Sequence, residues 1–125
     1  MHQSKALTAL SALAHESRLD LIRLLMPHGD EGLTAGDIGR HLGLSASRLS
    51  FHLAALEQAG LLLSRKQARH VFYAVNPDGM GGTIAFLLND CCGDHPTVRA
   101  CCKAANPADP AGSAKFRAPL SYPTE

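Results

Sequence analysis

Two adjacent pairs of cysteines are the residues of this chain best suited to chemistry. Cys91-Cys92 and Cys101-Cys102 fall within twelve residues and enclose a segment that contains Gly93 and Pro96. Successive residues of a regular helix point about 100° apart, so the thiols of one pair can share an ion only where a helix frays. Gly93 and Pro96 favour such fraying. We expect the enclosed segment to turn back and bring the two pairs together.

Clustered thiolates without supporting carboxylates select soft ions over Mg, Ca or Mn. Arsenic(III) or antimony(III), which take three thiolates, would use Cys91, Cys92 and either Cys101 or Cys102. A tetrahedral Zn or Cd site with four thiolates is the geometric alternative, although vicinal pairs are not the usual zinc spacing. A reversible disulfide or persulfide switch is another interpretation, and thiols without a role are a third. His95 is expected to be exposed to solvent rather than a ligand.

Length and composition limit what elements can position these thiols. The chain has 125 residues, 46% of them hydrophobic, which fits one globular domain. Its longest apolar stretch, Ile84 to Leu88, is far shorter than the roughly 18 residues that span a membrane. Thr8 and Ser11 interrupt the only stretch that resembles a signal peptide. Four cysteines are too few for a disulfide scaffold, so we expect a cytoplasmic protein with reduced thiols and no membrane partner.

The charge is unevenly distributed along the chain. Residues 40 to 70 contain five Lys or Arg residues and a single acidic residue, Glu57, whereas the whole chain is close to neutral. A basic centre in a balanced protein favours a polyanionic partner such as DNA, and solvated surface charge is the alternative.

Three helices are predicted from capping residues that precede periodic apolar residues. The caps are Ser17, Thr34 and Ser45. The helices that follow are expected to stop at Pro27, Gly43 and Gly60. An amphipathic first helix, with Leu7, Leu10 and Leu13 one turn apart, precedes them.

The connection Gly43-Leu44-Ser45 has the length and composition of the turn in a helix-turn-helix, so the helix after Ser45 is predicted to enter DNA. Arg48 is best suited to a base or phosphate contact, whereas His52 is equally consistent with a contact or with solvent exposure. The DNA-binding residues predicted in this helix are Ser45, Ser47, Arg48, Ser50, Phe51 and His52.

A β-hairpin is predicted after this helix. Residues 61–64 and 70–75 are rich in strand-forming residues, and residues 65–69 form a basic loop between them. Such a wing could place Lys66 and Arg69 on phosphates, and a solvated hairpin whose charges protect its edges is the alternative.

A last helix is predicted over residues 77 to 92, where an apolar stripe needs a partner. This helix and the first one could form a dimer interface, or they could pack within one chain. We therefore predict a mainly α fold with a β-hairpin wing (α+β), a dimeric winged helix-turn-helix. Residues 1–102 form its DNA-binding, dimerisation and ion-sensing domain, and residues 103–125 a flexible tail rich in Pro and Ala.

Signals for an enzyme are weak. Residues 79–84 depart from the phosphate-binding pattern of Gly-rich loops, because Ile84 takes the place of the last Gly. Cys91 and His95 have no third group to orient them as nucleophile and base. We predict that the protein is not an enzyme.

Residues 44–62, together with residues 12–19 and 65–73, resemble the ArsR/SmtB family of winged-helix repressors. The resemblance covers about residues 5 to 92. It implies a homodimer held by its first and last helices, which binds double-stranded operator DNA and releases it when a toxic ion binds.

The position of the cysteines favours one type within this family. Residues 33–40 lack the Cys of one arsenic-sensing type, and residues 79–90 lack the His of the zinc sensors. Residues 90–96 instead resemble arsenite-responsive members with a vicinal Cys pair at the end of the last helix. The resemblance thus implies arsenic(III), or antimony(III), as inducer and arsenic-resistance genes as targets; a redox, persulfide, Cd or Zn response is the alternative. Ala68 departs from the family, which often has Gly in the wing.

Overall fold

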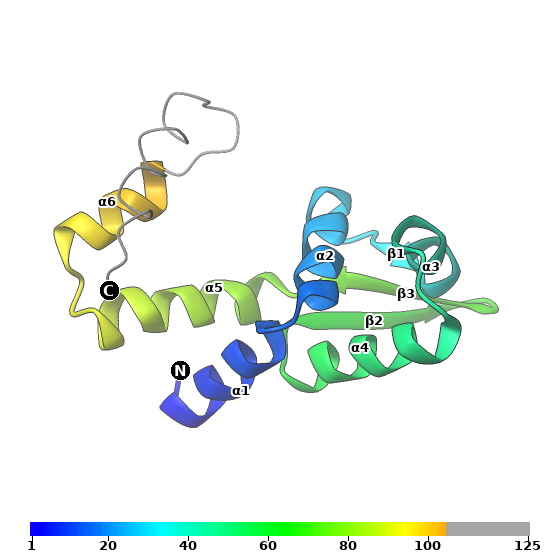
Figure 1. The fold of residues 1–125 in the computed structure, drawn as a ribbon, viewed down its shortest axis with the longest axis horizontal. Coiled ribbons are helices and arrows are strands. Elements are labelled where there is room, and N and C mark those ends of the chain that lie inside the picture. The colour runs from blue at the N-terminus through cyan, green and yellow to red at the C-terminus, as the bar shows by residue number, and fades with distance from the viewer. Residues whose placement is uncertain (105–125) are drawn as a thin grey trace. The chain divides into compact units, whose positions relative to one another are not determined.

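The structure is a computed structural model that describes residues 1–104 (Figure 1). The chain divides into two compact units, of which the first is Met1–Phe86 and the second begins at Leu87. The elements of the first unit are α1 (Gln3–Leu13), α2 (Glu16–Leu25), a 3-10 turn (Met26–His28), β1 (Leu33–Thr34), α3 (Ala35–Leu42), α4 (Ala46–Gln58), β2 (Leu62–Gln67), β3 (His70–Val75) and α5 (Pro77–Ala85).

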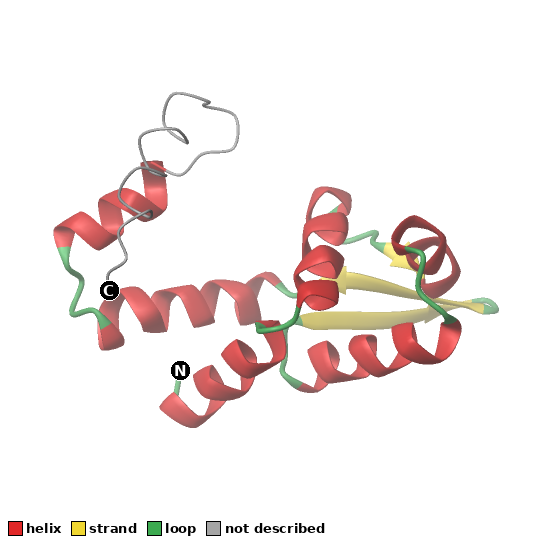
Figure 2. Ribbon diagram, viewed as in Figure 1, coloured by secondary structure: helices red, strands yellow, loops and turns green. Residues whose placement is uncertain are grey.

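The core of the first unit lies where its helices meet the base of a hairpin. α4 packs along β2, and α2 contacts β3 (Figures 1 and 2). Burial of large aliphatic side chains from every layer stabilises this arrangement by about 1.5–3 kcal/mol for each one. The largest fully buried side chains are Leu21, Leu25, Ile38, Leu56, Leu61 and Leu62. The winged helix-turn-helix predicted from the sequence is confirmed.

Two of the three predicted caps are present. The Thr34 hydroxyl accepts from the Asp37 amide at 3.2 Å and begins α3, and the Ser45 hydroxyl accepts from the Arg48 amide at 3.3 Å and begins α4. Gly43, with φ of 66°, ends α3 in the left-handed conformation that glycine adopts at little cost. The connection between these helices is therefore the tight turn that the sequence predicts.

The prediction that Ser17 caps the second helix is wrong. α2 begins at Glu16, and its N-cap, His15, makes no side-chain capping bond. The reason is the turn from α1, in which the His15 amide bonds to the Leu13 carbonyl and the His15 carbonyl already accepts from Arg18 and Leu19. Ser17 thus lies inside the first turn of α2.

The sheet has three antiparallel strands in the order β1-β3-β2. Gln67 pairs with His70, so only Ala68 and Arg69 form the turn. The predicted five-residue tip over residues 65–69 is wrong, because strand pairing continues through Arg65 and Lys66. Ala68 has φ of 58°, which is the conformation that disfavours a side chain at this position.

The last predicted helix is confirmed as far as Cys91, but its geometry changes along its length. α5 gives way to a π-helix over Phe86–Cys91, which extends from the end of the first unit into the second. The Cys92 amide bonds to the Leu87 carbonyl at 2.9 Å, five residues back. Gly93 and Asp94 then adopt φ of 59° and 56° and end the helix.

A further helix that the sequence did not predict, α6 (Pro96–Ala104), follows in the second unit. Pro96 is its first residue, a position where the missing amide hydrogen costs nothing. The predicted boundary at residue 102 stays a prediction, since Lys103 and Ala104 end α6 and residues 105–125 of the predicted tail lie outside the described residues. Within residues 1–104, no helix has the length and apolar character needed to cross a membrane.

Candidate nucleic-acid interface and thiol cluster

The outward face of α4 carries most of the predicted contact residues. Ser47, Arg48, Ser50 and Phe51 are exposed, and Phe51 presents 64% of its surface to solvent. They lie here because Leu49, Leu53 and Leu56 occupy the inward face, one or two turns apart. Ser45 is also exposed, but its hydroxyl already serves as the cap of the helix. A polar, cationic and aromatic surface at the start of a helix suits a DNA groove.

The expectation that His52 faces a partner or solvent is wrong. Its side chain is only 4% exposed, because it lies between Leu49 and Leu56 on the inward stripe of α4. Its Nδ1 accepts a hydrogen bond from Nε of Arg18 at 3.1 Å, and its ring packs edge-on against His15 with centroids 4.5 Å apart. His52 is therefore a structural residue. It lies beneath the exposed face of α4, which we call the reading surface and which comprises Ser47, Arg48, Ser50 and Phe51.

Burial lowers the pKa of the His52 imidazole, and the positive charges of His15, Arg18 and Arg48 lower it further. All four causes disfavour the charged ring. The imidazole is therefore neutral at physiological pH, as its role as an acceptor for Arg18 requires.

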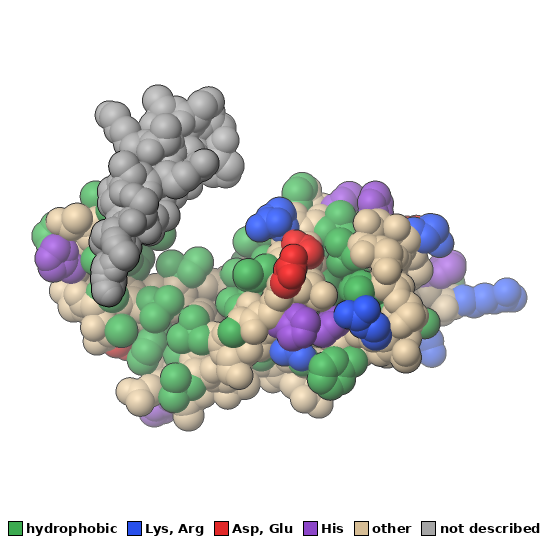
Figure 3. Space-filling view, viewed as in Figure 1, with side chains coloured by type: hydrophobic (Ala, Val, Ile, Leu, Met, Phe, Trp, Pro, Cys, Tyr) green, Lys and Arg blue, Asp and Glu red, His purple; other side chains and the backbone are tan. Residues whose placement is uncertain are grey.

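The hairpin exposes the two predicted cations of the wing. Lys66 lies in β2, and Arg69 in the turn, and both side chains are exposed. Figure 3 shows Lys and Arg side chains projecting at the tip of the hairpin. Both cations are therefore accessible to a partner.

Arg65, which the sequence assigned to the loop, has a different position. Its Nη1 donates to the backbone carbonyls of Asp30 and Glu31 at 3.2 and 3.0 Å, and its Nη2 donates to Gln67 at 3.3 Å. These partners lie up to 35 residues away in the chain, so no local pattern could have revealed them. Arg65 braces the wing against the segment before β1.

A cavity of about 490 Å³ opens between α3, α4 and β3. Its lining is mainly apolar, and its polar members are Arg40, Ser50 and Tyr73. Arg40 forms an ion pair with Asp37 one turn earlier in α3. Burial and the nearby Glu57 carboxylate raise the pKa of the Tyr73 phenol, which keeps it protonated. The Tyr73 and Ser50 hydroxyls thus give the cavity groups that can form hydrogen bonds.

The four thiols lie at two places in the second unit. Cys91 ends the π-helix and Cys92 follows it, whereas Cys101 and Cys102 lie in α6. All four are free; Cys91 and Cys102 are exposed, and the other two are half-buried. Partial burial raises the pKa of the Cys92 thiol, and Cys91 adds to the shift through its charge and a hydrogen bond.

The structure brings the thiols of the first pair together but does not assemble a complete ion site. Among residues 1–104, no three His, Cys, Asp or Glu side chains are grouped closely enough to hold a metal ion. Soft ions prefer thiolate ligands. The arrangement of the described residues, which we call the resting arrangement, does not group three of them.

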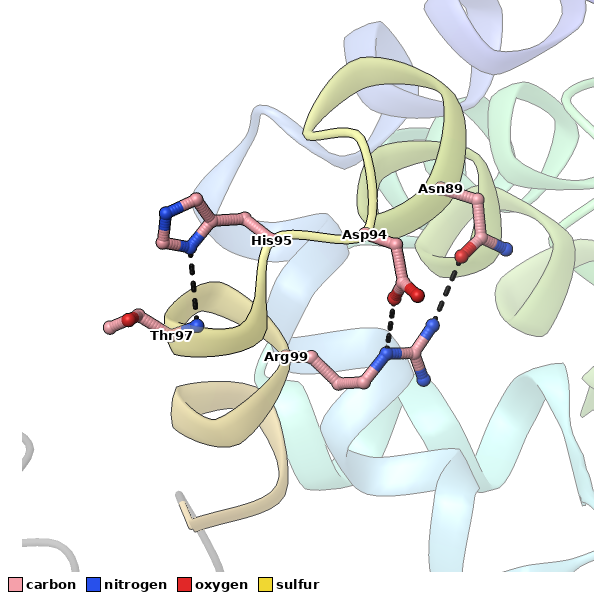
Figure 4. A network of polar contacts seen from close by, with 5 residues as sticks. All are labelled: Asn89, Asp94, His95, Thr97 and Arg99. Atoms are coloured by element: carbon pink, nitrogen blue, oxygen red, sulfur yellow. Dashed lines mark hydrogen bonds and ion pairs between the residues drawn. The ribbon is translucent and has the colours of Figure 1, made fainter.

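A network around Arg99 fixes the segment between the two pairs (Figure 4). Its Nη2 donates to Oδ1 of Asn89 at 3.0 Å, and its Nε pairs with the Asp94 carboxylate. His95 caps α6, since its Nδ1 accepts from the Thr97 amide at 3.1 Å. Sequence reasoning missed Arg99 because α6 itself was not predicted.

A three-helix core with a tight turn before an exposed helix and a hairpin beside it defines a winged helix-turn-helix protein. Residues 13–65 match the family described as a helix-turn-helix domain. The HTH-type transcriptional regulator YgaV of Escherichia coli K12 is 36% identical over 88 residues, which are 70% of this chain and 87% of that protein. The chain belongs to the ArsR/SmtB family of winged-helix transcriptional regulators.

Two further comparisons bear on the family. The arsenical resistance operon repressor of Escherichia coli K12 is 42% identical over 65 residues, which are 52% of this chain and 54% of that protein. The solved structure of HlyU from Vibrio cholerae N16961 is 36% identical, with a TM-score of 0.57, and the match covers 74% of this chain and 99% of that one.

Proposed function

We propose that this chain is a repressor that binds double-stranded operator DNA as a homodimer and releases it when arsenic(III), or antimony(III), binds its clustered thiols. The observation that carries the proposal is the combination of an exposed reading helix with four free thiols at residues 91–102. The genes that it would control are those of arsenic resistance.

DNA binding is supported by the two surfaces described above. Arg48 is a cation at the start of α4, and its guanidinium can bond in bidentate fashion to guanine. Lys66 and Arg69 of the wing are exposed for phosphate contacts. In a dimer, two copies of α4 would enter successive major grooves about 34 Å apart.

Dimerisation is supported by apolar side chains on two neighbouring helices of the first unit. α1 contacts α5, and each exposes a large aliphatic residue, Leu7 at 57% and Ile84 at 43%. A stripe of this kind is stable when it is covered, and a second copy of the chain supplies the same surface by two-fold symmetry.

Release by arsenic(III) is supported by the soft donor set and by the helix break at Gly93 and Asp94 beside it. Cys91 and Cys92 are adjacent in the chain, and one thiol from α6, Cys101 or Cys102, would complete a set of three. Because three ligands are not grouped in the resting structure, binding requires the segment around Gly93 to rearrange. Coupling between that rearrangement and the DNA-bound dimer would appear as a difference in operator affinity.

A redox response is the second candidate, and the four free thiols within twelve residues favour it. Two of the four thiols would form a disulfide, losing two protons and two electrons to an oxidant such as hydrogen peroxide, which would become water. The similarity to YgaV and HlyU extends over more of this chain than the similarity to the arsenical resistance repressor. It fits the redox candidate as well as it fits the arsenic candidate.

The test is fluorescence anisotropy of the fully reduced protein on the DNA upstream of its own gene. Separate titrations with arsenite, zinc and hydrogen peroxide distinguish the candidates. Release at near-stoichiometric arsenite is expected, whereas release by peroxide alone would favour the redox candidate. Absence of salt-dependent DNA binding would contradict both, because phosphate contacts weaken as salt rises.

Cysteine variants provide the matched controls. Replacing Cys91 and Cys92 together with Ser should abolish release by arsenite. Cys101→Ser and Cys102→Ser alone should each retain it, because the remaining thiol of that pair supplies the third ligand. The double variant of the second pair should lose it. Retention of release in both double variants would contradict the thiol site.

A further inference from the structure

Arg18 connects three helices of the first unit beneath the reading surface. From α2, its Nη1 donates to the carbonyl of Ala12 at the end of α1 at 3.3 Å, and its Nε donates to Nδ1 of His52 in α4 at 3.1 Å. The guanidinium also lies 5.4 Å from the ring centroid of Phe51, the most exposed aromatic residue of α4. One side chain thus links the first helix to the reading helix.

The link to α4 depends on the protonation state of His52. A neutral imidazole with its hydrogen on Nε2 offers Nδ1 as an acceptor, whereas an imidazolium has two donors and no acceptor. Since Arg18 has only donors, protonation of His52 would replace a hydrogen bond by repulsion between two cations. Because His52 is only 4% exposed, solvent contributes little to stabilising the added charge.

We propose that His52 is a positioning residue of the reading helix: its neutral imidazole, bonded to Arg18, holds α4 in place, and its protonation weakens operator binding. This inference rests on the proposed DNA binding. It also assigns Arg18 to the positioning of Phe51.

The charged groups around His52 all oppose its protonation. Those that face it are His15 just before α2, Arg18 in α2 and Arg48 in α4, and α1 contributes only the Ala12 carbonyl through Arg18. Burial lowers the pKa of His52 first, and these cations add to the effect. His52 is therefore neutral above the ordinary histidine pKa of about 6.5. The stability that its bond to Arg18 gives the folded state is lost as pH falls below that value toward the lowered folded pKa.

Exposed histidines should act in the opposite direction. His28 and His41, for example, are exposed, and any positive charge added to the protein surface strengthens attraction to phosphates. Ordinary surface titration thus predicts tighter DNA binding at low pH, whereas the Arg18–His52 bond predicts weaker binding. The sign of the pH effect separates the two.

The experiment compares operator dissociation constants at pH 8 and pH 5.5, at constant ionic strength, for the wild type, His52→Asn and the control His28→Asn. Asn offers an oxygen acceptor close to the position of Nδ1 but does not titrate. We expect weaker operator binding at pH 5.5 than at pH 8 for the wild type and for His28→Asn, because protonation of His52 removes the acceptor of its bond to Arg18. For His52→Asn, binding should be equal or tighter at pH 5.5.

Two outcomes overturn the inference while leaving DNA binding intact. One is tighter binding of the wild type at pH 5.5, and the other is the same weakening in His52→Asn as in the wild type. Absence of operator binding at both pH values would instead contradict the proposed function.

Nuclear magnetic resonance of the protein tests the local geometry without DNA. Long-range proton–nitrogen spectra of labelled histidine should show His52 as the Nε2–H tautomer, with a titration midpoint below 6.5. Arg18→Gln should move that midpoint upward, because one of the opposing charges is removed. An Nδ1–H tautomer, or a midpoint at or above 6.5, would overturn the inference.

Discussion

The guanidinium carbon of Arg65 lies 4.7 Å from the ring centroid of Phe72, and the two residues face each other in the register of β2 and β3. The same guanidinium bonds to the carbonyls of Asp30 and Glu31. A cation held by a ring and two carbonyls orients the hairpin, whereas Lys66 and Arg69 remain exposed. The basic segment of the wing thus contains residues with two different roles.

Salt dependence should separate these roles. Lys66→Ala and Arg69→Ala each remove two proposed phosphate contacts from the dimer, one from each copy, so the slope of log K against log salt should fall in magnitude by about 1.8 in each. Arg65→Ala should lower operator affinity at every salt concentration and leave the slope unchanged, because its partners belong to the protein. Anisotropy titrations at about 50 to 300 mM salt measure this slope for each variant. A reduced slope in Arg65→Ala would mean that Arg65 contacts a phosphate.

The turn of the wing should become more stable with glycine. Ala68 has φ of 58°, a conformation that costs a residue with a Cβ about 1–2 kcal/mol. Glycine removes this cost but adds about 0.4–1 kcal/mol of unfolded-state entropy. Ala68→Gly should therefore raise the free energy of unfolding by about 0.5 kcal/mol in urea denaturation. The control is Ala54→Gly at an exposed position of α4, which should lower the free energy of unfolding by about 1 kcal/mol. A decrease in both variants would contradict the strain argument.

Two glycines of α5 should respond to alanine in opposite directions. A Cβ at Gly79 would lie 1.9 Å from the carbonyl oxygen of Gly60, which also accepts from Asn76 at 2.9 Å. Gly79→Ala should therefore lower the free energy of unfolding by about 2–3 kcal/mol, as overpacking does. Gly81→Ala should raise it by about 0.5–1 kcal/mol, since among the described residues a Cβ there meets nothing within 4 Å. Equal effects in thermal denaturation would show that α5 does not pack on Gly60 in this way.

Local signals were sufficient for much of the fold. Thr34 and Ser45 could be predicted as caps because each bonds to an amide three residues away. Ser17 could not be excluded from its own sequence, since the preceding turn at His15 decides where α2 begins. The burial of His52 was detectable, because it lies on the same helical stripe as the buried leucines.

Long-range contacts account for what the sequence did not predict. Arg65 acquires its role from carbonyls 34 and 35 residues away, and Arg18 from a histidine 34 residues away. α6 was missed because Gly93 and Pro96 indicate a break, whereas Pro96 is also compatible with the first position of a new helix. The roles of such residues can be recognised only once the packing of the elements is known.

The Arg99 network should hold the thiol segment in its resting arrangement, in which three ion ligands are not grouped among the described residues. Arg99 pairs with Asp94 and donates to Asn89, and both charged side chains are partly exposed. Contacts of this kind contribute about 0.5–1 kcal/mol. Because ligand binding must overcome them, Arg99→Gln should tighten arsenite binding about two- to fivefold by favouring the rearranged state.

Arsenite titration followed by the ultraviolet absorbance of the arsenic–thiolate bonds measures this effect. The matched control is Arg23→Gln, which removes an exposed ion pair with Asp20 in the first unit and should leave arsenite affinity unchanged. Weaker arsenite binding in Arg99→Gln would mean that the network belongs to the bound arrangement instead. In that case Asn89→Ala, which removes a single neutral acceptor, should weaken binding by a smaller factor than Arg99→Gln, because only one of the two contacts is lost.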